Sequence, residues 1–180
     1  MSKTKNLVFT SLLIAMGVAL PLAFHAVPNA GSIFLPMHIP VLLCGLICGW
    51  HYGFVCGVLT PALSSVLTGM PPAAYLPSML FELAVYGLVG GLLLKYVRTR
   101  NDLADTIISL LGAMVAGRAV AGALKALIFN VGGYSMQMWI TSSFVTALPG
   151  IVIQIVAIPA VIQILRSTKL IPRNRAVTSA

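Results

Sequence analysis

The sequence contains little charge, and almost all of it has one sign. Only 8% of the 180 residues are charged, and the carboxylates are limited to Glu82, Asp102 and Asp105. Soluble proteins carry roughly 25% charged residues, so this chain could not cover a solvated globular surface. The chain is also 59% hydrophobic, with a mean hydropathy of +1.01. We therefore expect an all-α integral membrane protein.

Motifs for nucleotide hydrolysis and for metal binding are also lacking. The chain has no glycine-rich, lysine-containing phosphate loop, so any ATP hydrolysis would come from partner subunits. Cysteines are few and odd in number, which argues against disulfides. Cys44, Cys48 and His51 have a spacing that could offer ligands to a soft metal. No fourth ligand is evident, and a buried apolar role suits cysteine, so we expect neither a metal nor a cofactor.

Six apolar runs meet or approach the roughly 20 residues that a bilayer-crossing helix needs. The first run follows two lysines and could be read as a secretory signal, but five further runs follow it. We therefore predict a single domain, residues 1–180, that forms a bundle of six transmembrane helices. The expected spans lie near residues 7–27, 36–50, 52–67, 76–97, 104–129 and 142–165.

The basic residues predict the orientation of the bundle. The net charge of +8 arises mainly from three short clusters: Lys3 and Lys5; Lys95, Arg98 and Arg100; and Arg166, Lys169, Arg173 and Arg175. Basic residues beside span ends are retained on the cytoplasmic side, so six spans place all three clusters and both termini in the cytoplasm. The clusters form no basic stripe with interleaved aromatics, which excludes a nucleic-acid partner.

Three charged residues lie in the interior of the expected spans, more than three residues from a span end. Arg118 and Lys125 are seven residues apart in the fifth span, so they project from one helix face. Glu82 is the only acid in the interior of a span, and Tyr86 follows it by one turn on the same face. Glu82 could meet Lys125, but one acid cannot neutralise two bases. Charges at this depth are costly and often mark a transport path, so we expect more than structural pairing.

Other polar and aromatic residues flank these charges. His38 begins the second span, Gln154 lies in the sixth, and Asn130 and Trp139 lie in the loop after the fifth. Each has an ordinary explanation, such as a hydrogen-bonded core histidine or a solvated loop. Together they predict a positively charged cavity with aromatic walls that opens to the outer side. Such a site suits a small planar or polar solute, neutral or anionic.

Small residues recur every four positions in three of the expected spans. In lipid this pattern lets helices approach closely, and internal packing explains most of it. The members are Ala15 and Ala19; Gly45, Gly49, Gly53 and Gly57; and Ala113, Gly117 and Ala121.

Over nearly its whole length the sequence resembles the S component, or substrate-binding subunit, of energy-coupling factor vitamin transporters. The resemblance lies in the size, the topology, the Ala15-x-x-x-Ala19 pair, the Leu-Pro-Met-His-Ile-Pro stretch at 35–40, and Glu82-x-x-x-Tyr86-Gly87. It implies a membrane subunit of a prokaryote that works with a transmembrane coupling subunit and two cytoplasmic ATPases. Ala15 and Ala19 would contact the coupling subunit. The ligand would be a small water-soluble vitamin or precursor, held near the outer side.

We therefore expect a non-enzymatic subunit that captures solute for an ATP-driven importer. The alternative is a stand-alone, proton-coupled secondary transporter that uses Glu82, although no inverted repeat is evident. An enzyme built on Ser64 or Ser65 is not expected, because nothing places a histidine near them. The predicted substrate-binding residues are Arg118, Lys125, Glu82, Tyr86, His38, Gln154, Asn130 and Trp139.

Overall fold

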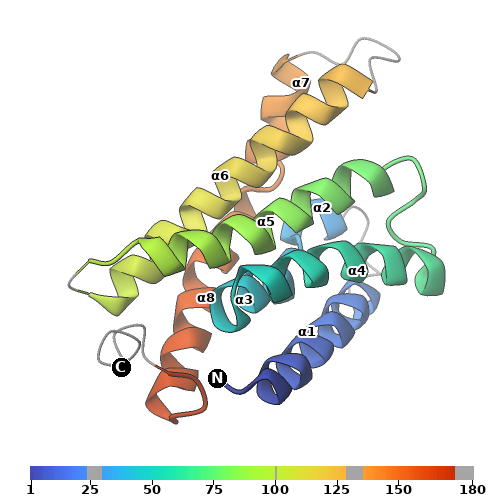
Figure 1. Cartoon of the computed structure of the whole chain (residues 1–180). Coiled ribbons are helices and arrows are strands. Elements are labelled where there is room, and N and C mark those ends of the chain that lie inside the picture. The colour runs from blue at the N-terminus through green and yellow to red at the C-terminus, as the bar shows by residue number, and fades with distance from the viewer. Residues whose placement is uncertain (24–29, 100, 129–135, 173–180) are drawn as a thin grey trace.

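The computed structural model describes residues 1–23, 30–99, 101–128 and 136–172, and all of the regular secondary structure in these ranges is helical (Figure 1). The longer helices are α1 (Lys3–Ala23), α3 (His38–Cys48), α4 (Trp50–Thr68), α5 (Leu76–Tyr96), α6 (Asp102–Ile128) and α8 (Leu148–Ser167). The shorter elements are α2 (Ala30–Phe34), α7 (Met136–Ile140) and a π-helix, η1 (Thr141–Val145).

Within the described residues, four helical segments are long and apolar enough to cross a membrane: Lys3–Ala23, Leu76–Tyr96, Asp102–Ala126 and Ser143–Ser167. The apolar helix α3 has 11 residues and is shorter than a bilayer span. The prediction of an all-α membrane fold is confirmed. The count of six spans and the orientation of the termini remain predictions.

Two glycines set the limits of α4. Gly49 separates α3 from α4 with a φ of 93°, and its N–H bonds to the carbonyl of Gly45. Gly69 ends α4 in the left-handed conformation, with a φ of 72° and its N–H bonded to the Ser65 carbonyl. Glycine adopts this region without the penalty that a Cβ imposes. The apolar runs predicted at 36–50 and 52–67 are therefore separate helices.

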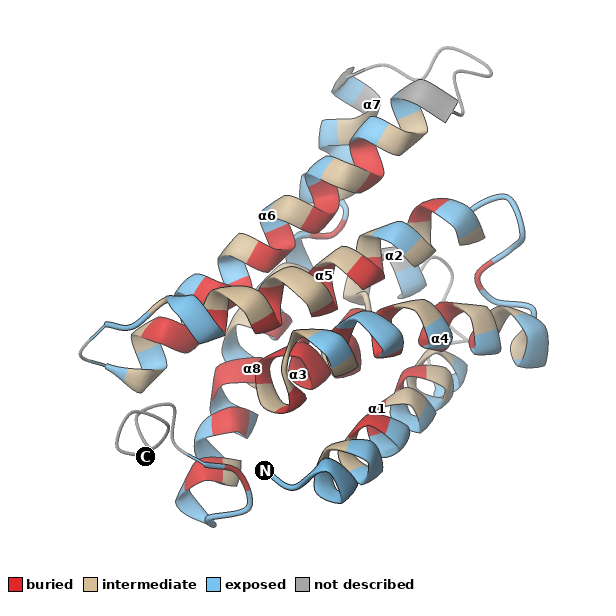
Figure 2. Cartoon of the chain, in the orientation of Figure 1, coloured by how far each residue is buried: buried red, intermediate tan, exposed pale blue. Residues whose placement is uncertain are grey.

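The core is centred on α3, which is buried along most of its length (Figure 2). Helix α5 packs along both α4 and α6, while α1 covers α3 and α4, and α8 contacts α3 and α6. The recurring small residues make these contacts close. A Cβ on Gly53 would collide with the Gly87 backbone, and a Cβ on Gly57 would collide with that of Leu83. The close-packing role expected for these glycines is thus observed.

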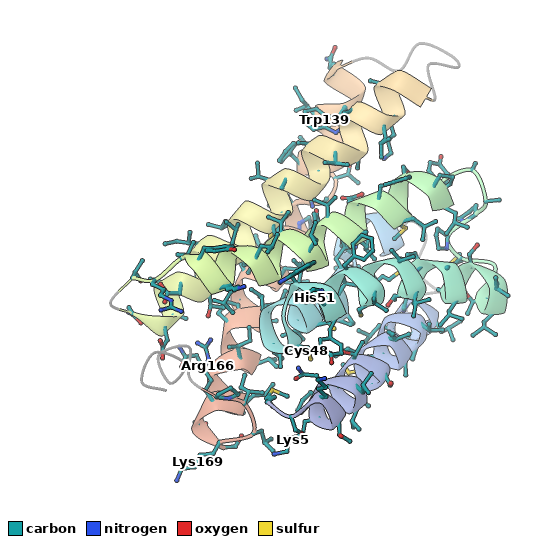
Figure 3. The ribbon with its side chains drawn as sticks, viewed as in Figure 1. Lys5, Cys48, His51, Trp139, Arg166 and Lys169 are labelled. Carbon is teal, nitrogen blue, oxygen red and sulfur yellow. The ribbon has the colours of Figure 1, made fainter. Side chains whose placement is uncertain are left out.

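The first residues of α1 and the last residues of α8 lie at the same end of the molecule, where α5 also ends and α6 begins (Figure 1). Lys5 and Lys169 are found at this end (Figure 3). Arg166 is buried there and donates hydrogen bonds to the Asp102 carbonyl, at 3.3 Å, and to Thr106 Oγ1, at 3.4 Å. These bonds join the end of α8 to the start of α6.

Candidate functional site

The centre of the candidate site is the hydroxyl of Tyr86, which connects two charged residues. Tyr86 is completely buried on α5, and its hydroxyl donates a hydrogen bond to Glu82 Oε1 at 3.2 Å. The same oxygen accepts a hydrogen bond from Arg118 Nε of α6 at 3.1 Å. The four-residue spacing of Glu82 and Tyr86 on one helix face makes the first bond possible. The predicted proximity of these two side chains is therefore observed.

Gly117 explains why the tyrosine ring can lie so close to α6. A Cβ at Gly117 would overlap the ring of Tyr86, so only glycine leaves room for it. The neighbouring residue on α6 is Arg118, whose side chain is only 3% exposed. The glycine thus brings the Tyr86 hydroxyl to the guanidinium.

His38 adds a third helix to this group. Its ring lies edge-on to the ring of Tyr86, with centroids 5.3 Å apart and an interplanar angle of 63°. His38 Nε2 is 3.7 Å from Glu82 Oε1, and the histidine is 2% exposed. It stands at the first position of α3, three residues after Leu35, whose φ of 50° is unusual for a residue with a Cβ. We call His38, Glu82, Tyr86 and Arg118 the polar cluster.

Two aromatic residues lie beside the polar cluster. The Arg118 guanidinium carbon is 5.4 Å from the centroid of Phe144, which is within cation–π range. Phe144 meets Trp139 edge-on, with centroids 5.6 Å apart. Trp139 in turn lies against Gly122 of α6, where a Cβ would overlap the indole. We call Trp139 and Phe144 the aromatic wall; Figure 3 labels Trp139 at the α6–α7 contact.

The aromatic wall corrects two features of the sequence reading. Trp139 was expected in a loop, but it lies in the short helix α7. Phe144 was not predicted as a site residue, and it belongs to the π-helix η1, within the expected sixth span. π-Helices are rare, mostly single-turn, and frequently found at functional sites. The local signal available was an aromatic residue close to two serines at the start of an apolar run.

Several buried polar atoms keep hydrogen-bonding capacity that the described residues do not use. They are both ring nitrogens of His38, Nη1 of Arg118, and both amide atoms of Gln154. Gln154 is completely buried on α8, one turn after Gly150, where α8 touches the end of α2. Buried polar groups are usually paired, so three such residues are suited to a polar ligand.

Within the described part of the chain, the remaining predicted site residues make no hydrogen bond with the polar cluster. Lys125 is partly buried, two turns beyond Arg118, and it lies near enough to Glu82 for an electrostatic interaction. The short contact of Glu82 with a basic side chain is instead to His38 Nε2, at 3.7 Å. Gln154 makes no hydrogen bond with the polar cluster, and Asn130 lies outside the described residues.

Cys44, His51 and Ser65, considered above as metal ligands or catalytic groups, make other contacts in the structure. Among the described residues, no three His, Cys, Asp or Glu side chains are grouped to hold a metal ion. His51 is exposed and stacks on Trp50, while Cys44 is buried and donates to Thr10 Oγ1 at 3.6 Å. Ser65 Oγ donates to the Pro71 carbonyl at 2.9 Å, which fixes the turn after α4.

Comparison with known protein families assigns the chain to one of them. The family model for the substrate-specific component of ECF transporters matches residues 5–162. The chain belongs to this family. No curated protein and no solved structure gives a significant match.

The match covers every helix that contributes to the polar cluster and the aromatic wall. As an ECF substrate-specific component, the chain is a multi-pass membrane protein and a transport subunit that works with other ECF subunits. The resemblance inferred from the sequence is confirmed.

Proposed function

We propose that this ECF component captures a small water-soluble solute, a vitamin or vitamin precursor, from the outer side of a prokaryotic cytoplasmic membrane. It passes the solute to an importer driven by ATP hydrolysis in two partner ATPases. The family match over residues 5–162 carries the proposal. The polar cluster supports it, because its buried His38 and Arg118, on two helices, retain unused hydrogen-bonding atoms, as does Gln154 on α8.

The binding set that we propose joins the polar cluster and aromatic wall to the other predicted residues. Arg118 and Tyr86 orient a polar group of the solute, and His38 and Gln154 offer further donors and acceptors. Trp139 and Phe144 provide aromatic surfaces for a planar ring. Lys125 belongs to the same proposed set, as does Asn130, which lies outside the described residues.

The orientation that we propose has six spans and both termini in the cytoplasm. Lys5 and Lys169 lie at one end of the molecule, together with the turn between α5 and α6 (Figure 3). The Gly69–Pro72 turn after α4 and the last described residues of α6 lie at the opposite end (Figure 1). This distribution agrees with retention of basic residues on the cytoplasmic side.

The docking face that we propose is formed by Ala15 and Ala19. Both are exposed on α1, whereas Thr10, Leu13 and Gly17 of the same helix are buried. An exposed small-x-x-x-small pair allows a partner helix to approach closely. The transmembrane coupling subunit is the partner proposed for this face.

Copurification tests the docking face directly. The double substitution Ala15→Leu and Ala19→Leu is expected to reduce copurification with the coupling subunit at least about tenfold, because bulky side chains separate the helices. The matched control is Ala119→Leu with Ala123→Leu, a second exposed alanine pair with the same spacing on α6. Equal losses in both double variants would show that α1 is not the docking face.

Uptake by the reconstituted complex tests the energy source. Proteoliposomes that hold the chain, the coupling subunit and both ATPases are expected to accumulate solute only when ATP is present on the side of the membrane that carries the ATPases. Concentrative uptake by the chain alone, abolished by collapsing the proton gradient, would instead support the secondary transporter that uses Glu82.

A further inference from the structure

The charged side chains near the polar cluster do not balance. Arg118 and Lys125 both lie within electrostatic reach of Glu82, which is the only carboxylate among them. The two other acids of the whole sequence, Asp102 and Asp105, stand at the far end of α6. Thirteen helical residues separate Asp105 from Arg118, about 20 Å along the axis. Arg118 and Lys125 therefore outnumber Glu82 by one positive charge.

Hydrogen bonding locates this excess charge. Glu82 already accepts the Tyr86 hydroxyl and faces His38, so its negative charge is engaged within the polar cluster. Arg118 uses Nε on Tyr86, while its Nη1 is buried without a hydrogen-bond partner among the described residues. Phe144 contacts the guanidinium but provides no charge of opposite sign. Arg118 Nη1 is therefore a buried, charged donor that the described residues leave available.

We propose that the solute is a monoanion whose carboxylate, or a similar acidic group, binds at Arg118 Nη1. This inference rests on the proposed function and specifies its substrate class. A monoanion cancels the surplus charge and supplies an acceptor to the unused Nη1 donor of Arg118. A cation would add a third positive charge, and a neutral solute would leave the surplus unbalanced in a medium of low dielectric constant.

A panel of matched compounds tests the charge of the solute. Aromatic and aliphatic scaffolds are each supplied as carboxylate, carboxamide and aminomethyl forms, and binding to the purified chain is followed by tryptophan fluorescence and thermal unfolding. For scaffolds that bind, the carboxylate is expected to bind at least about tenfold more tightly than its carboxamide. Equal or tighter binding of the neutral or cationic form would overturn the proposal, as would a panel in which no carboxylate binds.

A charge series in the protein gives an independent test with the best carboxylate of the panel. Lys125→Met removes the surplus charge and is expected to weaken binding about tenfold, whereas Glu82→Gln adds to the surplus and is expected to strengthen binding. Glutamine keeps an oxygen that can accept the Tyr86 hydroxyl. The double variant restores the original net charge and is expected to recover most of the affinity lost in Lys125→Met.

The opposite ranking of these affinities would show that net charge does not determine binding of the carboxylate. If Glu82→Gln weakens binding and the double variant binds more weakly than either single variant, both residues contact the solute separately. Thermal midpoints of all variants show whether folding has changed. Copurification with the ECF partners is measured in parallel, because intact assembly with failed carboxylate binding overturns only this inference. Failed assembly with retained carboxylate binding counts instead against the proposed function.

Discussion

Tyr86 determines the geometry of the polar cluster, because one hydroxyl accepts from a cation and donates to an anion. Tyr86→Phe removes both bonds but preserves the buried ring. The expected cost is about 1–3 kcal/mol of unfolding free energy, since Arg118 Nε and Glu82 Oε1 each lose a buried partner. Thermal or denaturant unfolding in detergent measures this loss.

The control for this prediction is Tyr96→Phe. Tyr96 is 71% exposed, so loss of its hydroxyl leaves no buried group without a partner. Equal stability of the Tyr86→Phe variant and the original protein would mean that the hydroxyl bridge does not hold the helices together.

Some of these individual residues could be recognised from the sequence, and others could not. Glu82 and Tyr86 share a helix face by spacing alone, and intramembrane charge drew attention to Arg118. Helix spacing does not reveal neighbours on other helices. Lys125 was the partner considered for Glu82, but the 3.7 Å contact of Glu82 is with His38, and Phe144 was missed because a π-helix carries it to Arg118.

At the level of helices, the contact between α4 and α5 depends on glycine more than on large apolar side chains. Gly87→Ala would place a Cβ against the Gly53 backbone, which cannot move without separating the two helices. We expect about 1–3 kcal/mol of destabilisation, as is typical of overpacked cores. The lower thermal midpoint in detergent would be accompanied by a lower folded yield.

Gly90→Ala is the matched control on the same helix. Its added Cβ would be 3.5 Å from the Ala113 Cβ, an ordinary van der Waals contact. We expect little change in stability, because alanine also favours the helix more than glycine does. Similar destabilisation by both substitutions would contradict the assigned contact between Gly87 and Gly53.

The six longer helices were largely predictable, because apolar runs and their interruptions are written in the sequence. The break between α3 and α4 was anticipated, although it occurs at Gly49 rather than after Trp50. The short helices α2 and α7 were not predicted, since five residues carry no useful periodicity. The sixth apolar run was read as one helix, but its first residues belong to η1.

For the whole molecule, the distribution of basic residues gives a prediction about membrane orientation. Ala73 and Ser2 are both exposed, the first after α4 and the second before α1. A cysteine at Ala73 is expected to react with a membrane-impermeant thiol reagent in intact cells. A cysteine at Ser2 is expected to react only after permeabilisation, because the proposed orientation places the N-terminus in the cytoplasm.

The unmodified protein is the background control for this labelling. Its three native thiols are free and buried, so they should contribute little signal. Labelling of Ser2→Cys but not Ala73→Cys in intact cells would reverse the proposed orientation.

Fold class and family could be inferred from composition, span lengths and a few motifs, because each is a property of the chain itself. The order in which helices pack could not. Recurring small residues show that close approaches exist, but they do not say that Gly53 meets Gly87 or that Gly117 meets the ring of Tyr86.

The shortness of α3 limits what the chain can do alone. Its 11 residues extend about 16 Å, roughly half the hydrocarbon core of a bilayer. His38 stands at its first position, and Val41, Leu42, Leu43 and Leu46 lie buried between that position and Cys48. A charged solute held at the polar cluster would have to shed its hydration to cross this apolar plug. We therefore expect the isolated chain to bind solute without conducting it across the membrane.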